Sequence, residues 1–100
     1  MIYHPSVKVE FFGVPRLRAG VSETKVECPS EVISLGTLLE VLSKRFPGFG
    51  QQCIETNDSG DCKLKRSIIA NIDGEAFVKS SATEIRTDQT IMILSSDAGG

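Results

Sequence analysis

The first third of the chain alternates between apolar and polar residues, which predicts two strands. Residues 7–12 alternate until Phe12, which is expected to point away from the core. Residues 23–28 alternate again, and we expect them to run antiparallel to the first strand. Residues 16–20, which carry two arginines, are expected to form a connection. The side chains expected to face a core from the first strand are Val7, Val9 and Phe11.

A change to helical spacing predicts one amphipathic helix after Ser34, a residue type that caps helix N-termini. Lys44 and Arg45 fall in its last turn, where the helix dipole favours cations. The helix is expected to end at Pro47-Gly48. Its expected buried face consists of Leu35, Leu38, Leu39, Leu42 and Phe46.

Residues 48–65 follow neither period and are expected to form a long surface loop, with one short turn around 51–54. This segment contains Cys53 and Cys62, and a disulfide between them is one open alternative. The total of three cysteines is odd and their spacing fits no metal site, which favours reduced thiols in a cytoplasmic protein.

The last third of the chain returns to strand-like patterns. Asp73-Gly74 is the best hairpin signal in the sequence. Residues 80–88 are expected to form a polar connection anchored by Ile85. The expected strands are 67–72, 75–79 and 90–94.

This order of elements predicts an α+β fold, with a mixed sheet of four to five strands and one main helix packed on one face. The last strand is expected beside the first. We expect one domain over residues 1–94 and a flexible C-terminal tail over 95–100.

The helix can cover only one face of the sheet, so the other face needs an explanation. The residues expected on this open face, beside the root of the tail, are Phe12, Ile69, Met92 and Leu94. A contiguous apolar patch on a small domain indicates a partner surface. The alternative is that residues 48–65 fold back and cover it.

Composition excludes several classes of function. One hundred residues, 40% hydrophobic and 24% charged, are typical of one globular domain. A net charge of -2 without a basic run argues against a nucleic-acid surface. No apolar stretch reaches the ~20 residues of a membrane helix, and the first residues do not resemble a signal peptide. We therefore expect neither nucleic-acid nor membrane binding.

No set of residues indicates an active site. His4 has no evident partner, the carboxylates are scattered, and phosphate-loop, Cys-x-x-Cys and Ser-His-Asp patterns are missing from the sequence. We expect no metal, no tightly bound cofactor and no catalysis by this chain alone. The final diglycine can enter a narrow cleft because it has no side chains; a frayed end or a cloning scar is the alternative.

Taken together, these features resemble the ThiS/MoaD family of ubiquitin-like (β-grasp) sulfur carriers, most of all the small subunit of molybdopterin synthase. The resemblance spans about residues 6–100, and its most specific part is the Gly-Gly end after a final apolar strand. The segments that occur in the family's order are 7–13, 16–20, the helix after Ser34, Ile72-Asp73-Gly74-Glu75, 86–90 and Ala98-Gly99-Gly100.

The resemblance implies that Gly100 carries sulfur. A ubiquitin-activating-type enzyme would adenylate its carboxylate with Mg-ATP, and a persulfide donor would convert it to a thiocarboxylate. A large synthase subunit, such as the catalytic subunit of molybdopterin synthase, would then direct the sulfur to an acceptor in molybdenum cofactor biosynthesis. The resemblance also implies that Ala98 and Gly99 thread a channel of the partner and that Phe12 and Leu94 lie where the partner docks. We expect Ile69 and Met92 on the open face, and Asp97 in the tail, to contact the partner as well.

The chain departs from the molybdopterin pattern before its tail, where Ile93-Leu94-Ser95-Ser96 replaces a Phe-Phe-Pro-Pro-like run. Relatives with loops as long as 48–65 serve thiamin thiazole synthesis, tRNA thiolation, cysteine synthesis or secondary metabolism. Two other classes of function stay open. One is a ubiquitin-like modifier whose Gly100 forms isopeptide bonds with lysines, and the other is an interaction domain with an inert tail.

Overall fold

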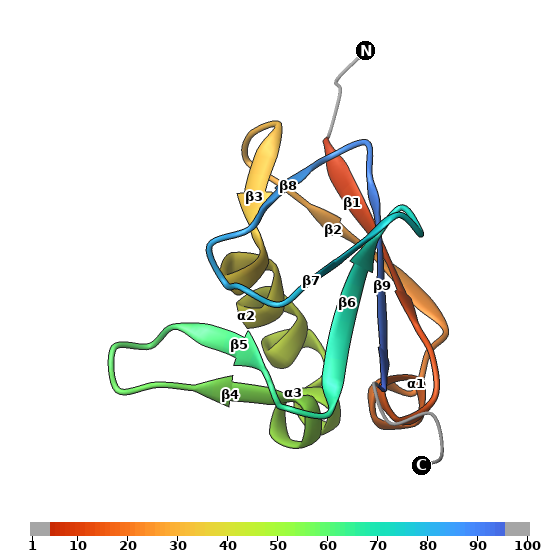
Figure 1. The fold of residues 1–100 in the computed structure, drawn as a ribbon, viewed down its shortest axis with the longest axis vertical. Coiled ribbons are helices and arrows are strands. Elements are labelled where there is room, and N and C mark those ends of the chain that lie inside the picture. Colours follow the sequence, from red (N-terminus) through yellow and green to blue (C-terminus); the bar gives the residue numbers. More distant parts are fainter. Residues whose placement is uncertain (1–4, 96–100) are drawn as a thin grey trace.

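Five strands form the main sheet, in the order β2-β1-β9-β6-β7 (Figure 1). The structure is a computed structural model that describes residues 5–95. β1 and β9 run parallel in the centre, and the other neighbours are antiparallel. The α+β class and the pairing of the last strand with the first are confirmed. The strands are β1 (Ser6–Phe11), β2 (Glu23–Glu27), β6 (Ile68–Ile72), β7 (Ala76–Val78) and β9 (Thr90–Ser95).

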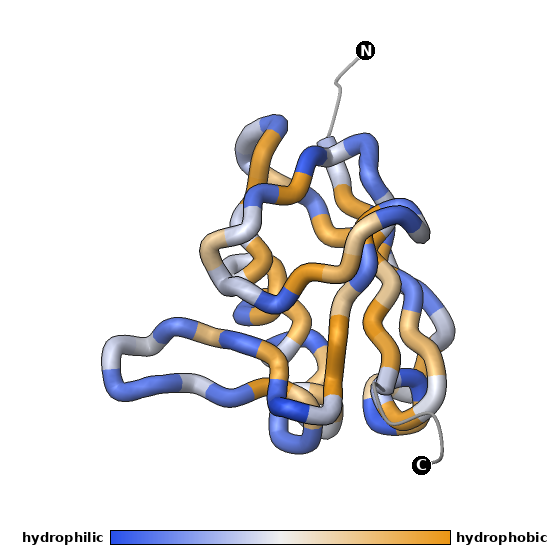
Figure 2. The backbone as a smooth tube through the Cα atoms, viewed as in Figure 1, coloured by the Kyte–Doolittle hydropathy of each residue, from blue (hydrophilic) through white to orange (hydrophobic). Residues whose placement is uncertain are grey.

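Alternation along the central strands places one set of side chains in the core, as predicted. Figure 2 shows apolar residues concentrated along these strands and helix α2. The apolar side chains that the three central strands bury are Val7, Val9, Phe11, Ile68, Ala70, Ile91 and Ile93. The even positions of β1 therefore point to the other face, which is the face that α2 leaves uncovered.

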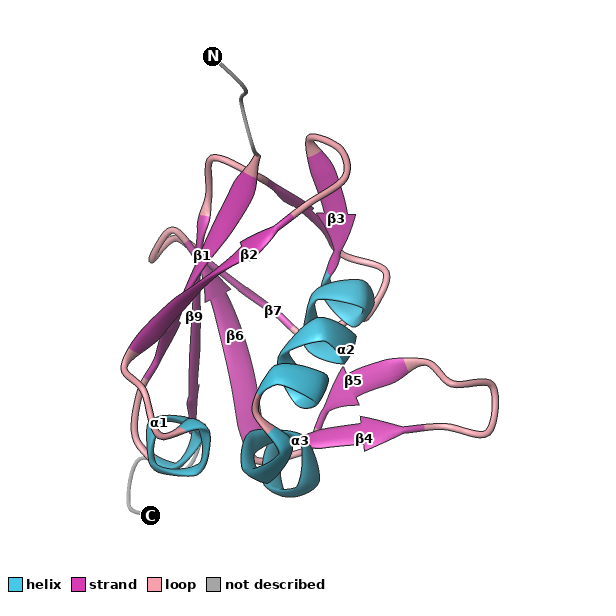
Figure 3. Ribbon diagram, turned by 180° about the vertical axis from the view of Figure 1, so that it is seen from behind, coloured by secondary structure: helices cyan, strands magenta, loops and turns pink. Residues whose placement is uncertain are grey.

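Helix α2 (Leu35–Arg45) packs on the inner face, as predicted (Figure 3). Ser34 caps it, since the Thr37 N–H donates to the Ser34 Oγ at 3.1 Å. The fully buried stripe is Leu35, Leu38, Leu39 and Leu42. Each buried leucine removes its apolar surface from water, which stabilises the fold by about 1.5–3 kcal/mol per side chain.

The expectation that residues 16–20 form a plain connection is wrong, because helix α1 (Val14–Ala19) lies there. Gly13 starts it at φ 63°, a conformation that strains other residues, so the chain can turn sharply out of β1. Pro15 is compatible with the first turn of the helix, where its missing N–H is not needed. In the last turn the Gly20 N–H donates to the Arg16 carbonyl at 2.9 Å. Six residues are too few to reveal a helical period.

The prediction of one long loop over residues 48–65 is also wrong. Helix α3 (Pro47–Cys53) follows α2 directly and buries Phe49, whose ring centroid lies 5.1 Å from that of Phe11. Strands β4 (Ile54–Thr56) and β5 (Cys62–Leu64) then form a hairpin that contacts α2 and projects from the body (Figure 1). The alternative that this segment covers the open face is therefore wrong as well.

Residues 80–88 contain a strand that was expected to be a connection. β8 (Glu84–Arg86) pairs antiparallel with β3 (Val32–Ser34), in a second two-stranded sheet. Ile85 is fully buried, which confirms its predicted anchoring role. Both strands have three residues, too few to show an alternation. The Asp73-Gly74 turn between β6 and β7 is confirmed, with φ values of 56° and 73°.

Candidate functional site

An apolar row crosses the open face of the sheet beside the end of β9. Ile69 and Leu94 are cross-strand partners, and the Phe12 N–H donates to the Ile93 carbonyl at 2.9 Å, which brings Phe12 next to Leu94. Phe12 is 40% exposed, and Leu94 and Ile69 are half-buried. Met92 lies on the same face, two residues earlier in β9. The four residues predicted on this face therefore lie together, and their docking role stays a prediction.

A groove of about 760 Å³ opens next to this row, between α1, α3 and the ends of β6 and β9. Leu17 of α1 is 72% exposed on its rim, and Val14 lies one turn before it. Neither was predicted to belong to the site, although their spacing of three residues is a weak helical signal. The groove is lined by Phe12, Gly13, Val14, Leu17, Gln52, Ser67, Ile68, Leu94 and Ser95.

Close packing of α3 against α1 shapes one wall of this groove. A Cβ atom on Gly48 would lie 2.9 Å from the Arg18 carbonyl oxygen, closer than real contacts allow. Glycine at this position therefore lets the two short helices approach. Because α1 ends at Ala19 and α3 begins at Pro47, two segments far apart in the sequence meet at this wall.

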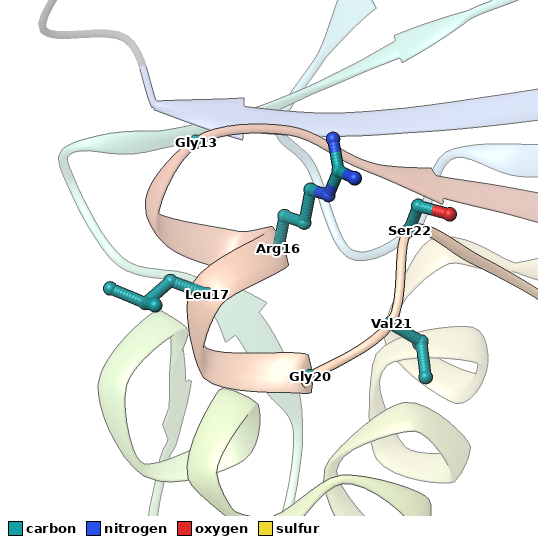
Figure 4. A pocket seen from close by; sticks show the side chains of 6 residues that line it. All are labelled: Gly13, Arg16, Leu17, Gly20, Val21 and Ser22. Carbon is teal, nitrogen blue, oxygen red and sulfur yellow. The ribbon is translucent and has the colours of Figure 1, made fainter.

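The other side of α1 holds a shallow pocket of about 460 Å³. In Figure 4 the Arg16 side chain extends toward Ser22, whereas Leu17 points away from both. Helix α1 has no acidic residue in its first turn, and within residues 5–95 neither Arg16 nor Arg18 forms an ion pair. The two arginines therefore give this short helix a positive charge that no carboxylate of the described residues pairs with.

The cysteines do not form a reactive site. All three are free and buried, and burial raises the pKa of Cys28 and Cys53 above the ordinary value of 9.0, although Lys65 and Arg18 partly offset this for Cys53. Neutral buried thiols are poor nucleophiles. The Cys53 carbonyl accepts from the Lys65 N–H, so Cys53 lies opposite Lys65 and no disulfide joins it to Cys62.

Residues 5–95 contain no group of three or more possible metal ligands. Within the same range, no helix is both long and apolar enough to span a membrane. The predicted site residues Asp97, Ala98, Gly99 and Gly100 lie outside the described residues. β9 ends at Ser95 in the wall of the groove, so the segment that contains them starts at this point.

Comparison with known proteins establishes the fold. The sequence matches no protein-family model, and no curated protein matches it significantly. Among solved structures, the crystal structure of SAMP1 from Haloferax volcanii has a TM-score of 0.74 at 18% identity and covers 95% of this chain and 99% of that one. The solution structure of small archaeal modifier protein 1 from Methanosarcina acetivorans has a TM-score of 0.72 at 24% identity, covering 99% and 100%.

A third similar structure is a protein of Pyrococcus furiosus assigned provisionally as subunit 1 of the molybdopterin converting factor. It has a TM-score of 0.67 at 23% identity and covers 90% of this chain and 95% of that one. At these identities the likeness concerns the fold. The mixed five-stranded sheet with one main helix is therefore a β-grasp fold, the ubiquitin-like architecture predicted from the sequence.

Proposed function

We propose that this protein is a sulfur carrier whose Gly100 becomes a thiocarboxylate. The observation that supports this proposal is the position of Ser95, which ends β9 in the same groove as Phe12, Leu17 and Leu94. In the proposed complex, an enzyme docked on this groove binds the residues that follow Ser95 in the sequence. The β-grasp fold also supports it, because a solved structure that shares the fold is provisionally assigned to the molybdopterin converting factor.

The chemistry starts with activation, because a carboxylate is a poor electrophile. A ubiquitin-activating-type enzyme binds Mg-ATP, the Gly100 carboxylate attacks the α-phosphorus, and pyrophosphate leaves. The terminal sulfur of a persulfide donor then attacks the acyl carbon and displaces AMP. A second thiol of the donor cleaves the resulting acyl disulfide, which leaves the thiocarboxylate on Gly100 and a disulfide on the donor.

Delivery requires a second partner, a large synthase subunit. In the proposed complex it holds Asp97 and lets Ala98 and Gly99 pass through a narrow channel, which residues without large side chains can enter. The acceptor we favour is the pterin precursor of the molybdenum cofactor. The alternative is that the Gly100 thiocarboxylate of this protein serves another acceptor, in thiamin thiazole, tRNA thiolation, cysteine or secondary-metabolite synthesis.

A second candidate function is a protein modifier whose Gly100 forms isopeptide bonds with lysines. The observation that favours it is the fold match to two small archaeal modifier proteins, with TM-scores of 0.74 and 0.72. Both functions begin with the same adenylation. They separate at the acceptor, which is a small molecule for the carrier and a lysine of another protein for the modifier.

Intact-mass analysis tests the proposal directly. After incubation with the activating enzyme encoded in the same genome, ATP and a persulfide donor, we expect a mass gain equal to replacing one oxygen by sulfur. Fragmentation is expected to locate the gain at Gly100. An unchanged mass with an activating enzyme proven competent on its own carrier would refute the proposal. Lysine adducts without thiocarboxylate would support the modifier instead.

Serine substitutions at the groove are expected to weaken docking. Phe12→Ser and Leu17→Ser each remove exposed apolar contact area, and we expect the KM for the carrier in ATP–pyrophosphate exchange to rise about tenfold, which corresponds to ~1.4 kcal/mol. The kcat is expected to stay unchanged, because the tail is intact. Initial rates at varied carrier concentration measure both constants.

The matched control for this experiment is Val32→Ser. Val32 is 38% exposed, close to the value for Phe12, but lies on β3, far from helices α1 and α3 (Figure 1), and does not line the groove. We expect its KM to equal that of the wild type. If Val32→Ser and Phe12→Ser raise the KM equally, the groove is not the docking site.

A further inference from the structure

Asn71 presents an unusual polar group on the open face of the sheet. It is 6% exposed, and its Oδ1 is fully buried and accepts no hydrogen bond from residues 5–95. Met92 of β9 and Phe77 of β7 are its cross-strand partners on either side. A buried acceptor without a donor is destabilising, so its presence in a central strand needs a reason other than packing.

Phe77, the partner of Asn71 on β7, is 67% exposed. Contacts at both ends of β7 fix the position of this strand. The Asp73-Gly74 turn fixes the start of β7, and the Lys79 Nζ donates to the Arg66 carbonyl at 2.7 Å just after its end. Single exposed apolar residues are common on surfaces. An exposed aromatic ring beside an unpaired buried acceptor is more specific, because the two together offer a stacking surface and a hydrogen-bond site.

A charged residue, Glu10, lies on the far side of Met92 from Asn71. Glu10 of β1 is the cross-strand partner of Met92, so Glu10, Met92, Asn71 and Phe77 follow one another across four strands. The Glu10 carboxylate lies 3.8 Å from the Lys8 Nζ, which is shared with Glu23 at 3.6 Å. A single lysine therefore pairs with two carboxylates, so the Glu10 carboxylate can still accept hydrogen bonds from a partner.

An arginine is the side chain that this row fits best. Its guanidinium offers five donors in a plane and stacks on aromatic rings. Neighbouring strands lie about 4.8 Å apart, so Glu10 and Asn71 are about 10 Å apart with Met92 between them. A guanidinium lying over Met92 has Glu10 one strand away on one side and Asn71 one strand away on the other, and Phe77 lies one strand beyond Asn71.

We propose that the row of Glu10, Met92, Asn71 and Phe77 receives an arginine of the activating enzyme. This proposal rests on the proposed function, since an enzyme that holds the tail at the groove covers the same face. Because the Asn71 Oδ1 is buried in this structure, the amide has to turn about χ2 for its oxygen to meet the guanidinium. Asn71 thus positions the partner's arginine, and its unpaired oxygen lowers the stability of the free protein.

Asn71→Leu tests the proposal, because leucine is close in size but accepts no hydrogen bond. We expect the Tm to rise by about 4 °C, since an unsatisfied buried acceptor is removed. In ATP–pyrophosphate exchange we expect the KM for the carrier to rise about tenfold at unchanged kcat. A purely structural role for Asn71 would lower the Tm or leave the KM unchanged, and an unchanged KM overturns the proposal.

Two surface variants keep the test independent of folding. Phe77→Ser is expected to raise the KM about fivefold at unchanged Tm. Glu10→Gln is expected to reduce the salt dependence of the KM, because a rim charge that meets a cation is removed. The matched control is Glu55→Gln, since Glu55 pairs with Lys63 at 3.7 Å on the distant β4–β5 hairpin.

The outcomes separate this proposal from the carrier function. If the wild type is adenylated and all three variants keep its KM, the arginine site is wrong and the carrier function stands. If a competent activating enzyme does not adenylate the wild type, both are wrong. If Glu55→Gln changes the salt dependence as much as Glu10→Gln, the charge effect is unspecific and the role of Glu10 is refuted.

Discussion

Removal of Gly99 and Gly100 is expected to abolish activation of the protein and to leave its fold intact. Two residues span up to about 7 Å in an extended chain. The carboxylate of the truncated protein therefore ends about that far short of the ATP bound to the activating enzyme. A misplacement of 1 Å can cost about 10²-fold in rate, so a loss below detection is expected. ATP–pyrophosphate exchange measures the loss, and intact mass is expected to show no sulfur gain.

The fold of the truncated protein serves as the first control. The buried core lies within residues 7–93, so we expect an unchanged Tm. Gly100→Ala is the second control, because it keeps the chain length and the carboxylate and adds one methyl group. We expect it to be activated more slowly than the wild type but measurably. Full exchange activity without the two glycines would refute the role of Gly100 in activation.

Phe49→Ala is expected to lower the free energy of unfolding by about 3–5 kcal/mol. Phe49 is fully buried, and its ring meets the Phe11 ring edge-on at a centroid distance of 5.1 Å. It joins α3 to the central strand β1, so its loss leaves a cavity between these two elements. Small domains have total stabilities of about 5–15 kcal/mol, so this is a large fraction. Urea unfolding, extrapolated to water, measures it.

Phe77→Ala is the matched control for this second prediction. It is the same chemical change at a ring that is 67% exposed, and we expect a loss of less than about 0.5 kcal/mol. Similar losses at both positions would contradict the packing of α3 onto β1. A large effect at Phe49 alone would show that the segment after α2 is part of the core.

The sequence predicted the central sheet because side chains in a strand alternate with a period of two. Residues 7–12 are long enough to show this period, and the break at Phe12 correctly assigned that ring to the open face. The leucine stripe after Ser34 predicted α2 for the same reason at a period of 3.6 residues. Both predictions rest on elements that repeat their own pattern at least once.

Most of the shorter elements escaped prediction because they do not repeat a pattern, whereas the three-residue strand β7 was predicted with the help of the Asp73-Gly74 turn. Helices α1 and α3 have six and seven residues, and strands β3, β4, β5 and β8 have three each. Their conformations depend on what they pack against. Phe49 illustrates this, because an aromatic residue between two glycines predicts a loop unless Phe11 lies nearby to receive its ring.

The sequence by itself determined the sheet, its main helix and the side on which Phe12, Ile69, Met92 and Leu94 lie, because local periodicity is sufficient for these. Only the tertiary structure decided that α1, α3 and the end of β9 meet to form a groove, since these segments are far apart in the chain. It alone also decided the surroundings of Asn71. Its neighbours Met92 and Phe77 come from other strands, and strand register is set by the packing of the whole sheet.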